Sequence, residues 1–340
     1  MAALKRTAFA MALAATALTG LPGCRPASTA RATTPSTGDA LADASELPGR
    51  RALAREIYVA GVPLLARYAV VHARNIDRAS AEYQGPLNVL HWVMVSAESS
   101  RAEPGATVSA SLDLRAEPMV LRVPALPAAR TYVMQLTDLL ASVPAQISSR
   151  SSGNQAGDYL VVGPGWQGTV PVGITDVIHA DTSLVSVSGW IQQLATDSVH
   201  SRQQLQRGFR VQPLSRYLGV APPPMPTATE WPQPLPADLA RQSALFFGQL
   251  DALLSFAPMQ PGDRDLRQRL QQLEITPSQR NLAHAATRAL RDGMADGQRE
   301  IDQRRVAVED CQSDSLQGRD GDYSDAVSRA CAAQRSLKEG

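Results

Sequence analysis

Three glycines, Gly163, Gly165 and Gly168, are spaced as in loops that hold the pyrophosphate of a dinucleotide. That chemistry requires a strand before the loop and a helix that begins at its last glycine, because the helix N-terminus binds the phosphate. Residues 159–162 are strand-like, but residues 169–173 contain two β-branched valines and a proline that prevent a helix. We therefore interpret the run as a tight glycine turn between two antiparallel strands, and we expect no cofactor.

Carboxylates near predicted strand ends are the remaining candidates for acid-base chemistry. Asp113 and Asp138 are the candidate catalytic residues, and Asp158 has a similar position. Paired carboxylates can exchange protons with a substrate, whereas an aspartate at the end of a strand commonly forms a turn. Both interpretations stay open at this point.

Metal and nucleophile chemistry has little support in the sequence. The closest metal-like pair, His179 and Asp181, supplies two ligands where a site needs three or four, so no metal site is expected. Ser186 and Ser188 lie in a predicted strand without a G-x-S-x-G motif. A serine hydrolase stays open as an alternative, because triad partners need not be close in sequence.

Aromatic residues give a second set of binding candidates. Trp92, Trp166 and Trp190 are suited either to lining an apolar ligand pocket or to a hydrophobic core. The sequence does not distinguish these roles.

Composition indicates a globular protein without a nucleic-acid partner. The 340 residues are 44% hydrophobic, which is enough for one or two packed domains. Lys and Arg number 33 against 32 Asp and Glu, a net charge of +1, and no basic block is present.

The N-terminus has the pattern of an export signal. Lys5 and Arg6 precede an apolar, small-residue stretch over residues 7–20, which is too short to span a membrane. Cys24 follows it as the acylated cysteine does in a bacterial lipobox. We expect a signal peptide over residues 1–23 and a periplasmic protein anchored to the outer membrane through lipid on Cys24. Ordinary signal-peptidase cleavage is the alternative.

Two terminal segments have no core-forming composition. Residues 24–45, rich in Ser, Thr, Ala and Pro, are predicted to form a flexible tether. Residues 306–340 form a polar tail in which Cys311 and Cys331 either form a disulfide or stay as free thiols.

The central region is predicted to be β-rich. Residues 46–71 are expected to form two short helices that break at residues 61–63, ahead of the strands. Period-two alternation predicts strands over residues 107–114, 118–123, 131–136, 159–162, 169–178 and 183–187. The first two strands are expected to form a hairpin. Strands without intervening helices indicate an antiparallel sheet or sandwich, and a helix is expected over residues 197–208.

The remaining region is predicted to be helical. A proline-rich linker over residues 221–236 precedes helices over residues 237–305. Leu239, Phe246 and Leu250 are predicted to lie on one apolar helix face. The last helix is expected to begin at Thr276 and to place Gly293 against a closely packed neighbour. The predicted fold class is α+β: a sandwich-like or jelly-roll-like antiparallel domain with N-terminal helices, followed by a helical segment.

Several ordered motifs resemble the domain of unknown function 1254 (DUF1254) family. The resemblance covers about residues 50–220 and is carried by residues 57–63, 112–121, 130–138, 149–153, 157–168 and 205–215. It implies a β-rich domain that extends over residues 46–220. Members usually continue into a second domain of unknown function, 1214, which is expected to be missing here. The family's polar run before the first strand is replaced at residues 102–108, and Gly189-Trp-Ile191 stands where an Arg is common, so no catalytic residue is transferred.

Three functional hypotheses follow. The favoured one is an exported, lipid-anchored protein with a binding or accessory role, a small-molecule ligand and homo-oligomeric assembly. The first alternative is a periplasmic hydrolase or small-molecule enzyme, with a cleft between the β domain and the helices and with carboxylates such as Asp113 and Asp138. The second alternative is a truncated or degenerate family member without activity.

Overall fold

A computed structural model of the chain describes residues 37–95, 105–224, 230–256, 262–273 and 284–307. The chain divides into two compact units, Met1–Asp43 and Ala44–Gly340. The described residues of the first unit are 37–43, the beginning of the first helix, and all other described residues belong to the second unit.

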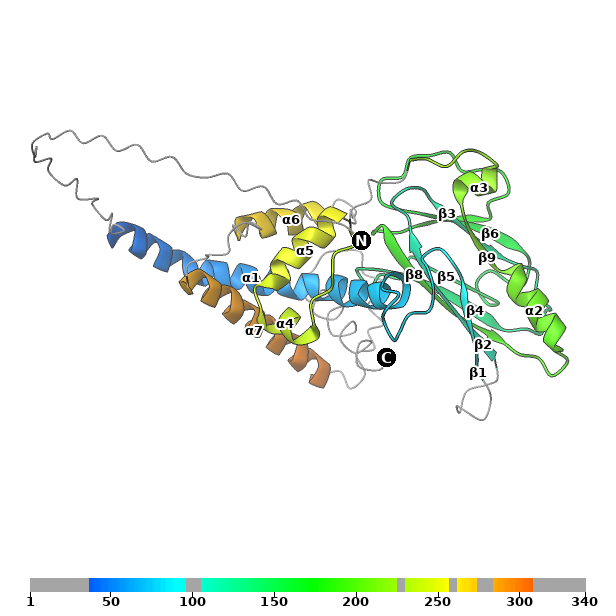
Figure 1. The fold of residues 1–340 in the computed structure, drawn as a ribbon, viewed down its shortest axis with the longest axis horizontal. Helices are drawn as coiled ribbons and strands as arrows, with labels where there is room; N and C mark the ends of the chain where they lie inside the picture. Colours follow the sequence, from blue (N-terminus) through cyan, green and yellow to red (C-terminus); the bar gives the residue numbers. More distant parts are fainter. Residues whose placement is uncertain (1–36, 96–104, 225–229, 257–261, 274–283, 308–340) are drawn as a thin grey trace, which may run out of the picture. The chain divides into compact units, whose positions relative to one another are not determined.

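In the described part of this unit, nine strands form two sheets (Figure 1). Sheet A has the order β1-β2-β8-β4-β5, with bounds His91–Val95, Gly105–Asp113, Leu184–Gln192, Tyr132–Asp138 and Ala145–Ser148. Sheet B has the order β7-β6-β3-β9, with bounds Asp176–His179, Gly157–Val162, Met119–Val123 and Arg210–Pro213. All pairs of sheet A are antiparallel. The predicted α+β class with an antiparallel β-rich domain is therefore confirmed, although β1, β5 and β9 were not predicted.

The two sheets pack face to face around an apolar core. Alternate residues of each strand point into it, as in Leu112 of β2, Leu136 of β4 and Val187 of β8. Residues of sheet B, among them Leu121 and Val161, complete this core. The opposite side of each strand in sheet A therefore forms an outer face.

The predicted hairpin of residues 107–114 and 118–123 is wrong, because β2 and β3 lie in different sheets. The reason is the burial of β3 on both sides: Leu121 faces the inter-sheet core, and Val120 belongs to a second apolar cluster outside sheet B. A strand with two apolar faces needs a covered, central position, and pairing with β6 and β9 provides one.

The strand that follows the glycine run also pairs in a different direction from the one predicted. The run leads to β7, which pairs in parallel with β6, so the predicted turn between antiparallel strands is wrong. Residues 163–175 form the crossover, about the dozen residues that a parallel connection needs. Gly165 has a positive φ of 71°, and Gly168 lies so close to the Trp166 ring that an added Cβ would be 2.6 Å from it.

The described chain also contains seven α-helices and one π-helical turn. The α-helices are α1 Thr37–Val71, α2 Val199–Gly208, α3 Leu214–Leu218, α4 Ala237–Gln242, α5 Leu245–Phe256, α6 Gly262–Gln272 and α7 His284–Ala307. The π-helical turn, His72–Ile76, continues α1. The α2 helix matches the helix predicted over residues 197–208. None of the helices described is long and apolar enough to cross a membrane.

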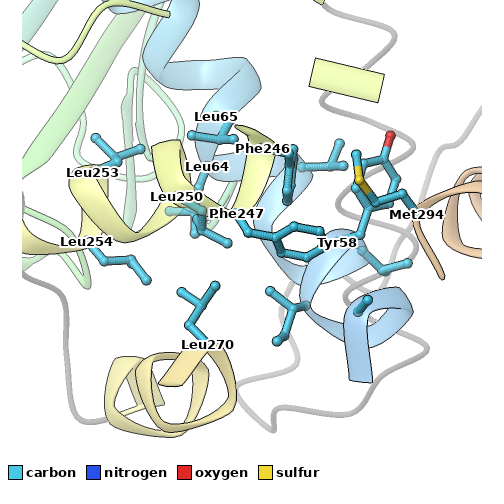
Figure 2. Close-up of a cluster of buried hydrophobic side chains, with 14 of the residues drawn as sticks. Tyr58, Leu64, Leu65, Phe246, Phe247, Leu250, Leu253, Leu254, Leu270 and Met294 are labelled. Atoms are coloured by element: carbon cyan, nitrogen blue, oxygen red, sulfur yellow. The ribbon is translucent and has the colours of Figure 1, made fainter. Parts of the chain in front are cut away.

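The α1 helix corrects two expectations. It continues through Pro63, where a break was predicted, and it begins at Thr37, inside the range predicted as a flexible tether. Buried residues on both sides of Pro63 hold the helix together, because Tyr58 and Leu64 pack into one core with Phe246 of α5 (Figure 2). Gly61 permits this contact, since an added Cβ there would lie 2.5 Å from Leu250.

The helical core joins α1 to the helices after the proline-rich segment. Phe247, Leu250, Leu270 and Met294 pack together with the buried side of α1 (Figure 2). Leu239 was expected to share the stripe of Phe246 and Leu250, but it is exposed on α4. The predicted start of the last helix at Thr276 lies outside the described residues.

The close packing predicted for Gly293 is confirmed. An added Cβ at Gly293 would lie 2.4 Å from the backbone oxygen of Arg51 and 2.8 Å from Ala54 Cβ. An added Cβ at Gly297 would lie 2.9 Å from Tyr58 Cδ1. These glycines let α7 approach the backbone of α1.

We expect Gly293→Ala to lower the free energy of unfolding by about 1–3 kcal/mol, because the methyl group meets backbone that must move. Gly248 of α5 is the matched control, since nothing lies within 4 Å of an added Cβ there. Gly248→Ala should instead raise stability by up to about 1 kcal/mol through helix propensity. Urea unfolding of both variants measures the difference, and equal effects would contradict the packing described.

Candidate functional site

Sheet A brings the two candidate carboxylates to the same end. Asp113 ends β2 and pairs with Leu184, whereas Asp138 ends β4 and pairs with Val185. Both aspartates therefore flank the first residues of β8, about 10 Å apart across two strand spacings. The sequence prediction of strand-end positions is correct for both.

The register nevertheless places the two side chains on opposite faces. Directly paired residues share a face, and neighbours along a strand do not. Val185 belongs to the inter-sheet core, whereas Leu184 packs into the helical core. Asp138 thus lies on the inner face and Asp113 on the outer face, so the two carboxylates do not form a pair around one substrate.

Asp113 is held by an arginine. Arg115 Nε donates to Asp113 Oδ1 at 2.8 Å, and Arg115 Nη2 donates to Oδ2 at 2.7 Å. The same guanidinium lies 4.3 Å from the ring centroid of Trp231 in the proline-rich segment. These contacts give Asp113 a structural role at the β2–β3 connection.

Asp138 is the unusual carboxylate. Its side chain is buried, with 1% of the residue exposed, and its Oδ1 accepts a hydrogen bond from Ser142 N at 2.9 Å. The other oxygen, Oδ2, is buried without a partner among the described residues. Burial raises the pKa of Asp138 to about 6, and the negative charge of Asp181 adds to this effect.

Arg67 of α1 is the cation whose charge acts on Asp138. It lowers the pKa of Asp138 by a minor amount, and burial lowers the pKa of the Arg67 guanidinium itself. Arg67 Nε is also buried without a partner in the described chain. Sequence reasoning missed this residue, although it is the one charged side chain within the apolar run of residues 59–71.

Because burial raises its pKa to about 6, Asp138 exchanges a proton close to neutral pH. A group of that kind is suited to general acid-base work only if substrate reaches it. At 1% exposure Asp138 has no such access in this conformation. Its hydrogen bond to Ser142 N instead matches the turn-forming role that the sequence left open.

The other predicted candidates are dispersed. Asp158 lies on sheet B, where Arg122 Nη1 is 3.2 Å from its Oδ2. His179 ends β7, and Asp181 follows it outside the strand. In the described part of the chain, no three His, Cys, Asp or Glu residues gather as they would around a metal ion.

The tryptophans also lie in separate places. Trp92 packs against Phe209 at the edge of the inter-sheet core, with ring centroids 5.5 Å apart. Trp166 packs on the outer cluster of sheet B, and Trp190 lies on the outer face of sheet A. They do not line one pocket.

Residues of the family-like motifs form structural ties. Glu117 accepts from Ser215 N at 2.6 Å and from Ser215 Oγ at 2.9 Å, which fixes the beginning of α3. Arg130 forms a bidentate pair with Asp197, at 2.6 and 2.8 Å. Sequence reasoning missed both interactions, because their partners are remote in sequence.

The cysteines with predicted roles, Cys24, Cys311 and Cys331, lie outside the described residues.

The fold and these contacts define a class: a two-sheet β domain tied by buried polar pairs and accompanied by a helical core. Residues 106–213, from β2 to β9, match the family model described as "Protein of unknown function (DUF1254)". This part of the chain belongs to the DUF1254 family, as its motifs predicted. No curated protein matches the sequence.

Among solved structures, the chain is similar to the VPA0106 protein from Vibrio parahaemolyticus. The TM-score is 0.64 and the identity 19%, over 85% of this chain and 67% of that one. This likeness concerns the fold alone. A protein from Burkholderia cenocepacia has a TM-score of 0.21 and 12% identity, over 50% of this chain and 55% of that one, which supports no argument.

Proposed function

We propose that this DUF1254 protein is an exported, lipid-anchored envelope protein with a binding role. The observation that carries the binding role is the separation of Asp113 and Asp138 on opposite faces of sheet A. The pair on which the hydrolase hypothesis depends therefore does not converge on a substrate. Asp113 is further occupied by Arg115.

Support for export comes from the N-terminal sequence. Lys5, Arg6 and the apolar stretch before Cys24 are arranged as in a bacterial lipoprotein signal. One acyl chain alone gives only reversible membrane binding, so stable anchoring requires more than one acyl chain on the modified terminus.

Cys24→Ala tests the anchor. We expect the unaltered chain, expressed in a bacterium, to be processed in a globomycin-sensitive manner and to be recovered with membranes. Cys24→Ala should lose both properties, because no thiol remains to carry lipid. Cys311→Ala is the matched control and should be processed normally. Processing that is unaffected by globomycin and by the Cys24→Ala substitution would contradict the proposal.

The binding role has its own test. Thermal-shift screening of the purified full-length chain against metals, nucleotides, sugars and small acids should find a stabilising ligand. That shift should persist in Asp113→Ala and Asp138→Asn if the site lies elsewhere. Catalytic turnover that both substitutions abolish would instead support the hydrolase.

A further inference from the structure

The outer face of sheet A is polar and unusually uniform. On its three central strands, outward positions alternate with the core residues already described. Away from the strand ends at Asp113 and Leu184, we call this set the hydroxyl face; it consists of Thr107, Ser109, Ser111, Val133, Gln135, Thr137, Ser186, Ser188 and Trp190.

Strand register aligns these residues in rows across the sheet. Ser188 of β8 is paired with Ser109 on β2 and with Gln135 on β4. In the next row, Trp190 is paired with Thr107 and Val133. Neighbouring strands are about 5 Å apart and successive outward residues about 7 Å apart, so these two rows form a small, dense lattice of polar groups.

The β2 hydroxyls are already in use, since Ser109 Oγ donates to Gln84 Oε1 and Ser111 Oγ donates to Asn75 Oδ1, and the open part of the lattice lies on β8 and β4. Ser188 is exposed, whereas Ser186, Gln135 and Trp190 are half-buried. The hydroxyls of Ser186 and Ser188 and the indole N–H of Trp190 have no hydrogen-bond partner among the described residues. Gln135 Nε2 donates to Thr137 Oγ1 at 3.3 Å, which leaves its carbonyl oxygen as an acceptor.

Trp190 lies directly against the sheet. An added Cβ at Gly105 would be 2.4 Å from Trp190 Nε1, so the glycine provides the space in which the indole rests. A half-buried indole fixed in this way is a flat apolar platform beside a row of hydroxyl and amide groups.

The nine residues of the hydroxyl face carry no charge, and the nearby outward carboxylate, Asp113 at the end of β2, is neutralised by its ion pair with Arg115. None of the residues of the hydroxyl face is Asp, Glu, Lys or Arg, although these residues make up 19% of the chain. The outer face of sheet B shows the contrast, because Arg122 and Asp158 pair there beside Arg210. A ligand that matches the hydroxyl face is therefore neutral, with many hydroxyl groups and an apolar ring face.

We propose that the hydroxyl face binds a neutral saccharide, which specifies the ligand of the binding role proposed above. The indole of Trp190 stacks on the apolar face of one sugar ring. Ser188, Ser186 and Gln135 exchange hydrogen bonds with the ring hydroxyls. Binding removes water from these uncharged donors and acceptors, so each one needs a hydrogen-bond partner on the ligand. A charged side chain at the centre of the face would lose its hydration without gaining an opposite charge, so it opposes binding.

Isothermal titration tests this with the full-length chain in a detergent that has no sugar headgroup. The probes are maltotetraose, cellotetraose and chitotetraose, with a sulfated heparin tetrasaccharide as the charged comparison. At least one neutral probe should bind and change the tryptophan fluorescence. Ser188→Asp, at an exposed position, should weaken that binding by about tenfold or more. Trp190→Phe should weaken it and remove the fluorescence change.

Trp166→Phe, on the other sheet, is the matched control and should leave affinity and the fluorescence change intact. An unchanged unfolding midpoint shows that Ser188→Asp is folded. The proposal is overturned if no neutral probe binds at millimolar concentration, if only the sulfated probe binds, or if both face substitutions leave affinity unchanged. If the thermal-shift screen then finds a ligand of another class, the proposed binding role stands without the saccharide. Cys24-dependent processing supports the proposed lipid anchor independently of either result.

Discussion

Replacing Arg130 with Met is expected to lower the free energy of unfolding by about 3–5 kcal/mol at pH 7, because the substitution leaves Asp197 buried without its cation. Both side chains are only 6% exposed, and Arg130 Nη2 lies 2.6 Å from Asp197 Oδ1. Arg130 Nη1 also donates to Gln192 O at 2.7 Å, so the pair ties the end of β8 to the segment before α2. Urea unfolding of the full-length chain measures the loss.

Two controls separate burial from charge. Arg122→Met breaks the more exposed pair with Asp158 and should cost less than about 1 kcal/mol. The double variant Arg130→Met with Asp197→Leu should recover much of the stability, since no uncompensated charge remains. A loss below 1 kcal/mol for Arg130→Met would show that the buried pair is not a major tie.

The Arg130 interaction also has a pH dependence of known sign. Hydrogen bonding from Arg130 holds the pKa of Asp197 below its ordinary value. The stability that this pair contributes is therefore present above the ordinary aspartate pKa and is lost as pH falls through the lowered one. The difference between the unaltered chain and Asp197→Asn should thus shrink in acid.

Asp138→Asn is expected to have the opposite effect. Burial raises the pKa of Asp138 from 3.8 to about 6, so ionising this carboxyl in the folded state costs about 3 kcal/mol relative to the unfolded chain. The cost is absent below about pH 4, develops between about pH 4 and 6, and is complete above that range. Asparagine keeps an oxygen that accepts from Ser142 N but cannot ionise.

The measurement is the difference in unfolding free energy between Asp138→Asn and the unaltered chain at pH 4 and at pH 7. This difference in unfolding free energy should move in favour of the variant by about 3 kcal/mol as pH rises, a figure that already includes the opposing charge of Arg67. Asp197→Asn is the matched comparison, since its lowered pKa makes its difference change mainly below about pH 4 and stay nearly constant from pH 4 to pH 7. A constant difference for Asp138→Asn would contradict the raised pKa.

The Asp138 result also bears on function. If the variant is more stable at pH 7 and still binds its ligand, the carboxylate is a buried turn residue that the fold tolerates. Loss of a catalytic turnover in a stable variant would instead indicate an acid-base role, in keeping with the common cost of active-site polarity to stability.

Local patterns in the sequence predicted much of the fold. Alternating apolar and polar residues indicated the strand that ends at Asp113. The small residues along one side of the last helix indicated that another element packs closely at Gly293. Both signals arise from geometry within one element, where the period of side chains determines which residues share a face. The family motifs added the β-rich domain that the match over residues 106–213 supports.

Other features depended on contacts between remote segments. Helix α1 continues through Pro63 because residues on both sides of it are buried against α5 and α7, and local propensity alone favours a break. The crossover after Val162 returns β7 in parallel to β6, which the glycine run does not specify. The buried partner of Arg130 is 67 residues away.

The sequence by itself placed Asp113 and Asp138 near strand ends and Ser186 and Ser188 in a strand, and its motifs resembled the DUF1254 family, which the match over residues 106–213 supports. The tertiary structure decided which faces meet. Asp113 is paired with Leu184 and Asp138 with Val185, and this offset of one residue places the two carboxylates on opposite sides of sheet A. Side chains alternate along a strand, so a shift of one residue exchanges core and surface, and only the pairing of distant strands sets that register.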